Sequence, residues 1–105
     1  MNMNTFLSFD IGASSGRAVL ISFKGKQFEM REIHRFTNRI LEMHGRFYWD
    51  IFHIYSELKE ALKICRKEQL SISSIGIDTW GVDFGYIGKD GVLLGLPRAY
   101  RDPYT

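Results

Sequence analysis

The first third of the chain contains three β-prone runs separated by short turns, and the third run alternates apolar and polar residues. Residues 6–9 and 17–23 are β-prone and largely apolar, and residues 28–36 alternate apolar and polar positions almost without exception. Such alternation is typical of strands with one solvated face. Gly25 lies between the second and third runs, where it favours a tight turn. The pattern therefore predicts a three-stranded antiparallel meander whose third strand lies at an edge.

The clearest helix signal follows an irregular connection. Residues 37–48 lack a regular period, and we interpret them as a connection that contains a short strand at 46–49. Asp50 then stands where the N-cap of a helix belongs. Beyond it, apolar residues recur at the spacing i, i+3, i+4 and i+7, with charged residues between them. The apolar positions are Ile51, Ile54, Tyr55, Leu58, Ala61, Leu62 and Cys65. This pattern predicts a helix whose apolar stripe covers a sheet.

The last third of the chain predicts one further strand and a hairpin. Residues 72–78 form a short apolar run, and a helix of crossover length precedes them. We therefore expect them to pair parallel to the strand at 6–9. Residues 82–87 and 92–95 flank an Asp-Gly pair at 90–91, which is a strong hairpin signal. The order of elements predicts an α/β fold.

Composition narrows the class of protein more than it indicates a function. At 105 residues the chain is one domain at most, and 45% hydrophobic with 25% charged residues is an ordinary soluble balance. A net charge of +2 without a cluster of basic residues gives no case for nucleic-acid binding. Cys65 is the single cysteine, so no internal disulfide can form. No apolar run approaches the ~18 residues that span a bilayer. We expect a soluble, cytoplasmic protein, and the uncovered aromatic and charged residues at 96–105 indicate part of a larger one.

The segment between the first two predicted strands has the residues of an anion-binding turn. Gly12 and Gly16 can adopt positive φ and let the backbone approach a ligand, and Ser14 and Ser15 add hydroxyl groups. Asp10 would repel a bare phosphate but would hold a hydrated Mg²⁺ that phosphates share. The spacing is neither that of a P-loop nor that of a Rossmann turn. The alternative is an ordinary hairpin in which Asp10 caps the turn and the small residues serve only geometry.

A second carboxylate, Asp78, ends its predicted strand as Asp10 ends the first. If the two strands are parallel neighbours, both carboxylates emerge at the edge where ligands gather in open α/β sheets. Trp80 and Gly81 follow, and an aromatic wall beside an approachable backbone suits a sugar. The alternatives are that Asp78 only caps a turn and that Trp80 only packs in the core.

Four other residues could in principle act as nucleophiles or metal ligands, but we expect them to have structural roles. Cys65 lies on the apolar stripe of the predicted helix and is expected in the core and not as a nucleophile. His34, His44 and His53 have no spacing that would gather them on one metal ion.

Several segments together resemble a known family. They are residues 9–17, 32–36, 49–50 and 74–84, with Tyr100-Arg101-Asp102. These segments resemble the N-terminal part of the FGGY carbohydrate kinases, over nearly the whole chain. The block at 76–84 is similar to that of members that phosphorylate L-rhamnulose and separates the chain from members that act on glycerol, xylulose or gluconate. Tyr104 is a departure, since an Arg often stands there in similar proteins.

The resemblance implies a fold and a reaction. The fold is the actin-like, ribonuclease H-like ATPase fold, of which residues 1–105 would form the N-terminal portion of the first kinase domain. The reaction is phosphorylation of the 1-hydroxyl of L-rhamnulose in rhamnose catabolism, with ATP and Mg²⁺ as cofactors. The expected partners are the sugar and the remainder of the chain's own polypeptide, with neither nucleic acid nor membrane.

The resemblance also implies roles for single residues. The ATP phosphates would contact Ala13, Ser14, Ser15, Gly16 and Arg17. Asp10 would help to place the metal, and Gly81 with Trp80 would border the ketose. Phosphoryl transfer needs a base on the attacking hydroxyl, which we expect beyond Thr105, so the chain alone is expected to be inactive. The alternative is a non-catalytic nucleotide- or sugar-binding module of the actin-like superfamily.

Overall fold

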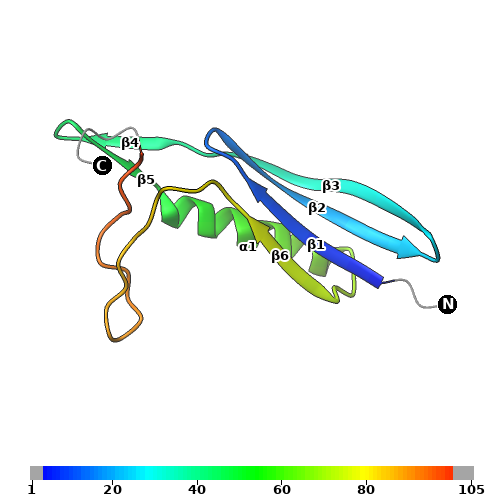
Figure 1. The fold of residues 1–105 in the computed structure, drawn as a ribbon. Coiled ribbons are helices and arrows are strands. Elements are labelled where there is room, and N and C mark those ends of the chain that lie inside the picture. The colour runs from blue at the N-terminus through cyan, green and yellow to red at the C-terminus, as the bar shows by residue number, and fades with distance from the viewer. Residues whose placement is uncertain (1–3, 101–105) are drawn as a thin grey trace.

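The computed structural model describes residues 4–100, and Figure 1 shows one sheet with a helix across one face and a separate small hairpin. The elements in chain order are β1 (Asn4–Ile11), β2 (Ser15–Lys24), β3 (Gln27–Thr37), β4 (Ile40–Met43), β5 (Arg46–Trp49), α1 (Ile51–Lys67) and β6 (Ser74–Asp78). No helix in the described part of the chain is long and apolar enough to cross a membrane.

The main sheet has the strand order β3-β2-β1-β6. β1, β2 and β3 pair antiparallel as a meander, and β6 returns after α1 to pair parallel to β1. The predicted meander, the edge position of β3 and the parallel pairing are therefore confirmed. The parallel register aligns Asp10 with Asp78, so the carboxyl ends of β1 and β6 lie at the same edge of the sheet.

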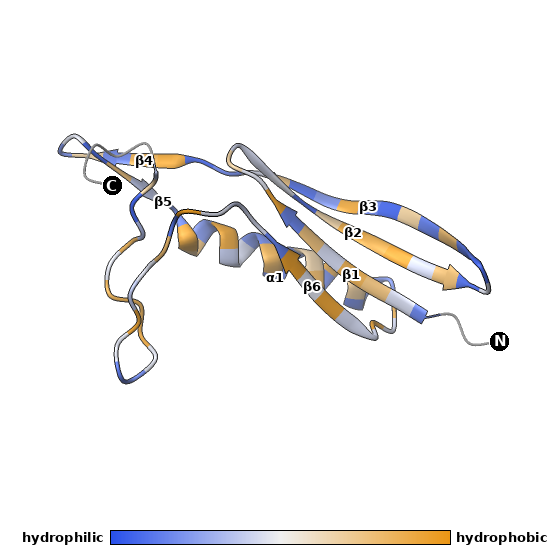
Figure 2. Ribbon diagram, in the orientation of Figure 1, coloured by the Kyte–Doolittle hydropathy of each residue, from blue (hydrophilic) through white to orange (hydrophobic). Residues whose placement is uncertain are grey.

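The core lies between α1 and one face of this sheet. Alternate residues of β1 point into it, which is why Leu7, Phe9 and Ile11 are buried. Figure 2 shows the corresponding alternation of apolar and polar positions along the strands. From α1 the buried side chains are Ile54, Ala61 and Cys65. The predicted helix is confirmed, and so is its N-cap, since the Asp50 carboxylate accepts a hydrogen bond from the His53 amide at 3.1 Å.

Two predictions about the connections need correction. Residues 46–49 form the expected strand, β5, but residues 40–43, expected as irregular, form β4 and pair with it. The turn between them has positive φ at His44 and Gly45. Residues 82–87 and 92–95 are not strands. The chain does turn back at the Asp-Gly pair, where the Gly91 amide donates to the Gly88 carbonyl at 3.0 Å, but the two segments meet at one isolated bridge, Ile87 to Leu93, and most of their residues stay exposed.

Candidate functional site

The turn between β1 and β2 is held by hydrogen bonds from a residue distant in sequence. The Gly12 amide donates to the Ser15 carbonyl at 2.8 Å, which closes the turn. Asn38, just after β3, donates its backbone N–H to the Ser14 carbonyl and its side-chain amide to the Gly12 carbonyl, each at 2.9 Å. Asn38 is buried, so the carbonyl oxygens of Gly12 and Ser14 are both bound by a residue inside the protein.

Positive φ does not explain the glycines of this turn. Neither Gly12 nor Gly16, both among the described residues, has positive φ, so that prediction is wrong. A methyl group on Gly16 would lie 2.2 Å from Cζ of Phe36, on the neighbouring strand. Gly16 is therefore needed because the Phe36 ring packs directly over its backbone.

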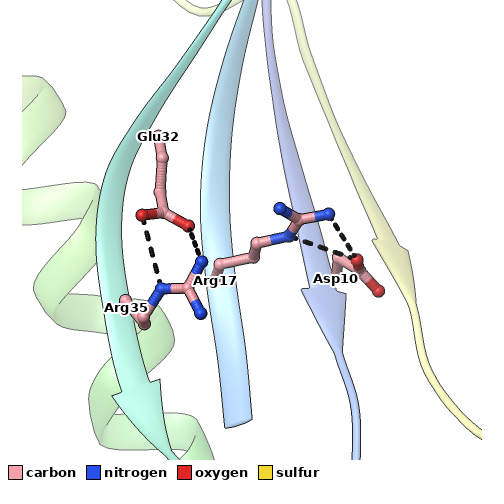
Figure 3. Close-up of polar contacts among 4 residues, drawn as sticks. All are labelled: Asp10, Arg17, Glu32 and Arg35. Carbon is pink, nitrogen blue, oxygen red and sulfur yellow. Dashed lines mark hydrogen bonds and ion pairs between the residues drawn. The ribbon is translucent and has the colours of Figure 1, made fainter.

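Asp10 and Arg17 form an ion pair at the end of the hairpin. Oδ2 of Asp10 accepts hydrogen bonds from Nε and Nη2 of Arg17, both at 3.3 Å (Figure 3). Arg35 faces Arg17 across β2 and β3 and is itself paired with Glu32 at 2.7 Å. The hydrogen bond with Glu32 raises the pKa of the Arg35 guanidinium, which therefore stays charged.

The strand register places these residues in one row across the sheet. Arg35, Arg17, Asp10 and Asp78 stand opposite one another on β3, β2, β1 and β6. The row is cationic at one end and anionic at the other. A polar cavity of about 250 Å³ opens beside its middle, and its lining includes Asp10, Gly12, Ser15, Arg17 and Arg35. Such a site suits an anion shared with a cation.

The row also fits a hydrated magnesium ion. Within residues 4–100 no group of three or more His, Cys, Asp or Glu side chains gathers as a metal site. Mg²⁺ bound with a nucleotide commonly needs only one or two carboxylates, with phosphate and water oxygens completing its shell. Asp10 is half-exposed and beside the turn, so it can supply that carboxylate.

The second corner follows β6 and contains two tryptophans. The indole N–H of Trp80 donates to Oδ2 of Asp83 at 2.5 Å, and the indole N–H of Trp49 donates to the same oxygen at 2.6 Å. The two rings lie 4.4 Å apart between centroids. Trp80 thus packs on a buried core residue and also lines a cavity of about 330 Å³. A Cβ on Gly81 would meet no atom of the described chain within 4 Å, which leaves this backbone approachable.

The structure brings the two predicted corners to one edge of the sheet. Asp10, which precedes the turn, and Asp78, which precedes Trp80 and Gly81, are in register on adjacent strands. Arg101, Asp102 and Tyr104 lie outside the described residues.

The cysteine and the three histidines that we expected to have structural roles lie in the core, in contacts between elements or in a turn. Cys65 is in the core, and burial raises the pKa of its thiol, which opposes nucleophilic chemistry. His34 pairs with Glu57 at 2.5 Å, and His53 contacts the Thr37 carbonyl at 2.9 Å. His44 occupies the β4–β5 turn.

Sequence reasoning missed two groups in this region. Asn38 lies in a segment without a regular period, and nothing local indicates that it reaches the first turn. The shared contact of Trp49 and Trp80 with Asp83 joins residues 34 positions apart. The short spacing of Trp80 and Asp83 within one loop could have indicated the contact between these two residues, but not the contact with Trp49.

No family model matches the chain, but individual proteins do. A rhamnulokinase of Bacteroides thetaiotaomicron is 51% identical over 100 residues, covering 95% of this chain and 21% of that protein. A rhamnulokinase of Halalkalibacterium halodurans is 45% identical over 103 residues, covering 98% of this chain and 22% of that protein. The chain thus spans about a fifth of the length of the curated relatives it matches.

Solved structures show the same fold at much lower identity. A gluconate kinase from Lactobacillus acidophilus superposes with a TM-score of 0.71 at 18% identity, covering 96% of this chain and 20% of that one. A xylulose kinase from the same organism gives a TM-score of 0.69 at 19% identity, covering 94% and 20%. The chain is therefore homologous to the N-terminal region of rhamnulokinases and has the fold of the N-terminal part of the FGGY carbohydrate kinases, an actin-like fold.

Proposed function

We propose that this chain is the N-terminal portion of the first domain of an ATP-dependent kinase that converts L-rhamnulose to L-rhamnulose 1-phosphate. The observation that carries the proposal is the register of Asp10 with Asp78. This register supports the proposal because the turn and the aromatic corner then follow strands that end at the same carboxyl edge of the sheet, where open α/β sheets bind ligands. The name shared by the matched relatives supplies the sugar.

In this proposal the turn binds the phosphates of ATP. The backbone and hydroxyl groups of Ala13, Ser14, Ser15 and Gly16 would donate to phosphate oxygens, and Arg17 would supply positive charge. Asn38 supports this arrangement because it engages two of the turn's carbonyl oxygens, which would otherwise repel an anion. Arg17 would exchange Asp10 for phosphate as its partner.

Asp10 would then be available to the magnesium ion. The metal would neutralise charge on the phosphates during transfer. Asp10 is half-exposed, and its hydrogen bonds to Arg17 are long for a charged pair. Breaking this ion pair should therefore cost little free energy.

Trp80 and Gly81 would border the sugar. The indole gives an apolar wall for the carbon face of a ketose, and the open backbone at Gly81 allows a hydroxyl group to approach. The base that deprotonates the 1-hydroxyl would come from a part of the relatives' length that this chain does not span. We place the reaction in the cytoplasm, where ATP is at hand and Cys65 stays reduced.

The proposal is tested on the polypeptide encoded by the complete reading frame. Calorimetric titration with L-rhamnulose, xylulose and fuculose, in the presence of a non-hydrolysable ATP analogue, should show tightest binding of L-rhamnulose. A coupled assay should detect ADP formation that depends on the sugar and on Mg²⁺, and Arg17→Gln should raise the KM for ATP. Nucleotide or sugar binding without turnover would favour the non-catalytic module instead, and binding of neither would reject both.

A further inference from the structure

The carboxylate of Asp83 joins two tryptophans that lie far apart in sequence. One oxygen, Oδ2, accepts both indole N–H groups, at 2.6 Å from Trp49 and 2.5 Å from Trp80. The other oxygen, Oδ1, is buried and has no hydrogen-bond partner among the residues that the structure describes. Asp83 is therefore committed to holding the two rings together.

One of the two rings, that of Trp49, is held in the core. Trp49 ends β5 and is 2% exposed, the largest fully buried side chain in the described part of the chain. Its backbone N–H donates to the Pro97 carbonyl at 2.9 Å, so its main chain is anchored as well. Through Asp83, the position of Trp80 is set by the core and not by its own loop.

The loop between Trp80 and Asp83 carries strain. Val82 has φ of +68°, a left-handed conformation that a β-branched residue rarely adopts, and its side chain is 85% exposed. An exposed valine gains no packing there that would compensate. The hydrogen bond from Trp80 to Asp83 closes this loop across Gly81 and Val82.

We propose that Asp83 is a positioning residue for the sugar corner: it fixes the Trp80 indole against Trp49 and so sets the backbone of Gly81 for a ketose. This inference rests on the proposed function for the identity of the ligand. The contact of Asp83 with the two indole rings does not depend on that function, and it is tested first.

The 105-residue chain contains two tryptophans, so tryptophan emission, excited selectively over tyrosine, reports only on these rings. Asp83→Ala should shift the emission to longer wavelength and, in a Trp49→Phe background, make Trp80 at least about twofold more accessible to acrylamide, because its acceptor is gone. Asp83→Asn, which keeps a neutral acceptor, should give an intermediate result. Asp90→Ala is the matched control, since Asp90 is a loop carboxylate that accepts from the Val92 amide away from both rings.

Val82→Gly distinguishes the effect of backbone strain at residue 82 from the effect of the hydrogen bond between Trp80 and Asp83. It removes the penalty for positive φ while leaving Asp83 in place, so thermal stability should rise and the fluorescence should stay unchanged. A folded Asp83→Ala chain whose emission and quenching match the wild type would overturn the proposal. Circular dichroism checks that each variant is folded.

The consequence for ligand binding is measured in the polypeptide used for the kinase assay. Asp83→Ala should raise the KM for the sugar at least about tenfold, the scale of a lost hydrogen bond, and leave the KM for ATP unchanged. Equal changes in both constants would show only general loss of structure, and an unchanged sugar KM would also overturn the proposal. If the wild type shows no activity, the proposed function fails, and the fluorescence result alone decides whether Asp83 fixes Trp80.

Discussion

Asn38 connects the turn of the candidate site to the body of the protein. It is buried and donates from both its backbone and its side chain to carbonyl oxygens of residues 12 and 14. Because a turn with free carbonyl groups would present negative charge to a phosphate, these two bonds shape the turn as well as hold it.

Asn38→Asp tests this role with a change of a single group. A carboxylate cannot donate to the Gly12 carbonyl and brings a second acceptor against it in a buried position. We expect the free energy of unfolding to fall by about 3 kcal/mol, measured by urea denaturation at neutral pH. Asn4→Asp makes the same change at an exposed position and should cost less than about 0.5 kcal/mol. Equal losses at the two positions would show that the Asn38 bonds contribute nothing specific.

Single residues also show why a sequence pattern can identify a position and mistake its reason. The sequence pattern singled out Gly16 for its conformational freedom, but its φ is not positive. A glycine is needed there because a side chain would collide with the ring of Phe36. That contact depends on the register of β2 against β3, which becomes visible only once the strands are paired. Asp10 was predicted as a metal ligand, and its pairing with Arg17 likewise depends on register.

The start of α1 is the element boundary that the sequence predicts best. Asp50 precedes the first apolar position of the helical pattern, and its side chain caps the helix by accepting from the amide of His53. Asp50→Ala removes this acceptor and should lower the free energy of unfolding by about 1 kcal/mol. Asp50→Asn keeps a good cap and should retain most of the stability, which thermal unfolding of both variants will measure. If Asn and Ala are equally destabilising, the cap is not the source of the effect.

Elements with a strong period were predicted correctly, and elements that depend on partners were not. β3 and α1 have clear periods of two and 3.6 residues, and β1 and β2 are β-prone apolar runs bounded by turns, so the existence and order of these elements could be predicted. β4 has no such period and is a strand because β5 folds back against it. The segments at 82–87 and 92–95 have strand-like composition, but no sheet face receives them, and they remain irregular.

At the scale of the whole molecule, the sheet is covered unevenly. The face under α1 is closed at β1 and β2, whereas all five residues of β6 are exposed. The order of the strands leaves one side of β6 unpaired within residues 4–100. This arrangement could be predicted in outline, since the helix and the parallel strand fix the order of the sheet. The Trp49–Asp83–Trp80 contact could not, because it forms only when the end of β5 meets the loop at 80–83, which is distant in sequence.

The open side of β6 predicts how the isolated chain behaves in solution. Ile75 and Ile77 are 49% and 58% exposed, and an apolar strand with free backbone groups is a template for pairing with another chain. We expect the 105-residue chain to self-associate as its concentration rises, measured by sedimentation velocity. Ile77→Lys should suppress this, because a charged side chain on an edge strand disfavours pairing. Val82→Lys is the control, since Val82 is more exposed but lies outside the strand. Suppression by both variants alike would assign the association to general hydrophobicity, whereas suppression by Ile77→Lys alone assigns it to the edge of β6.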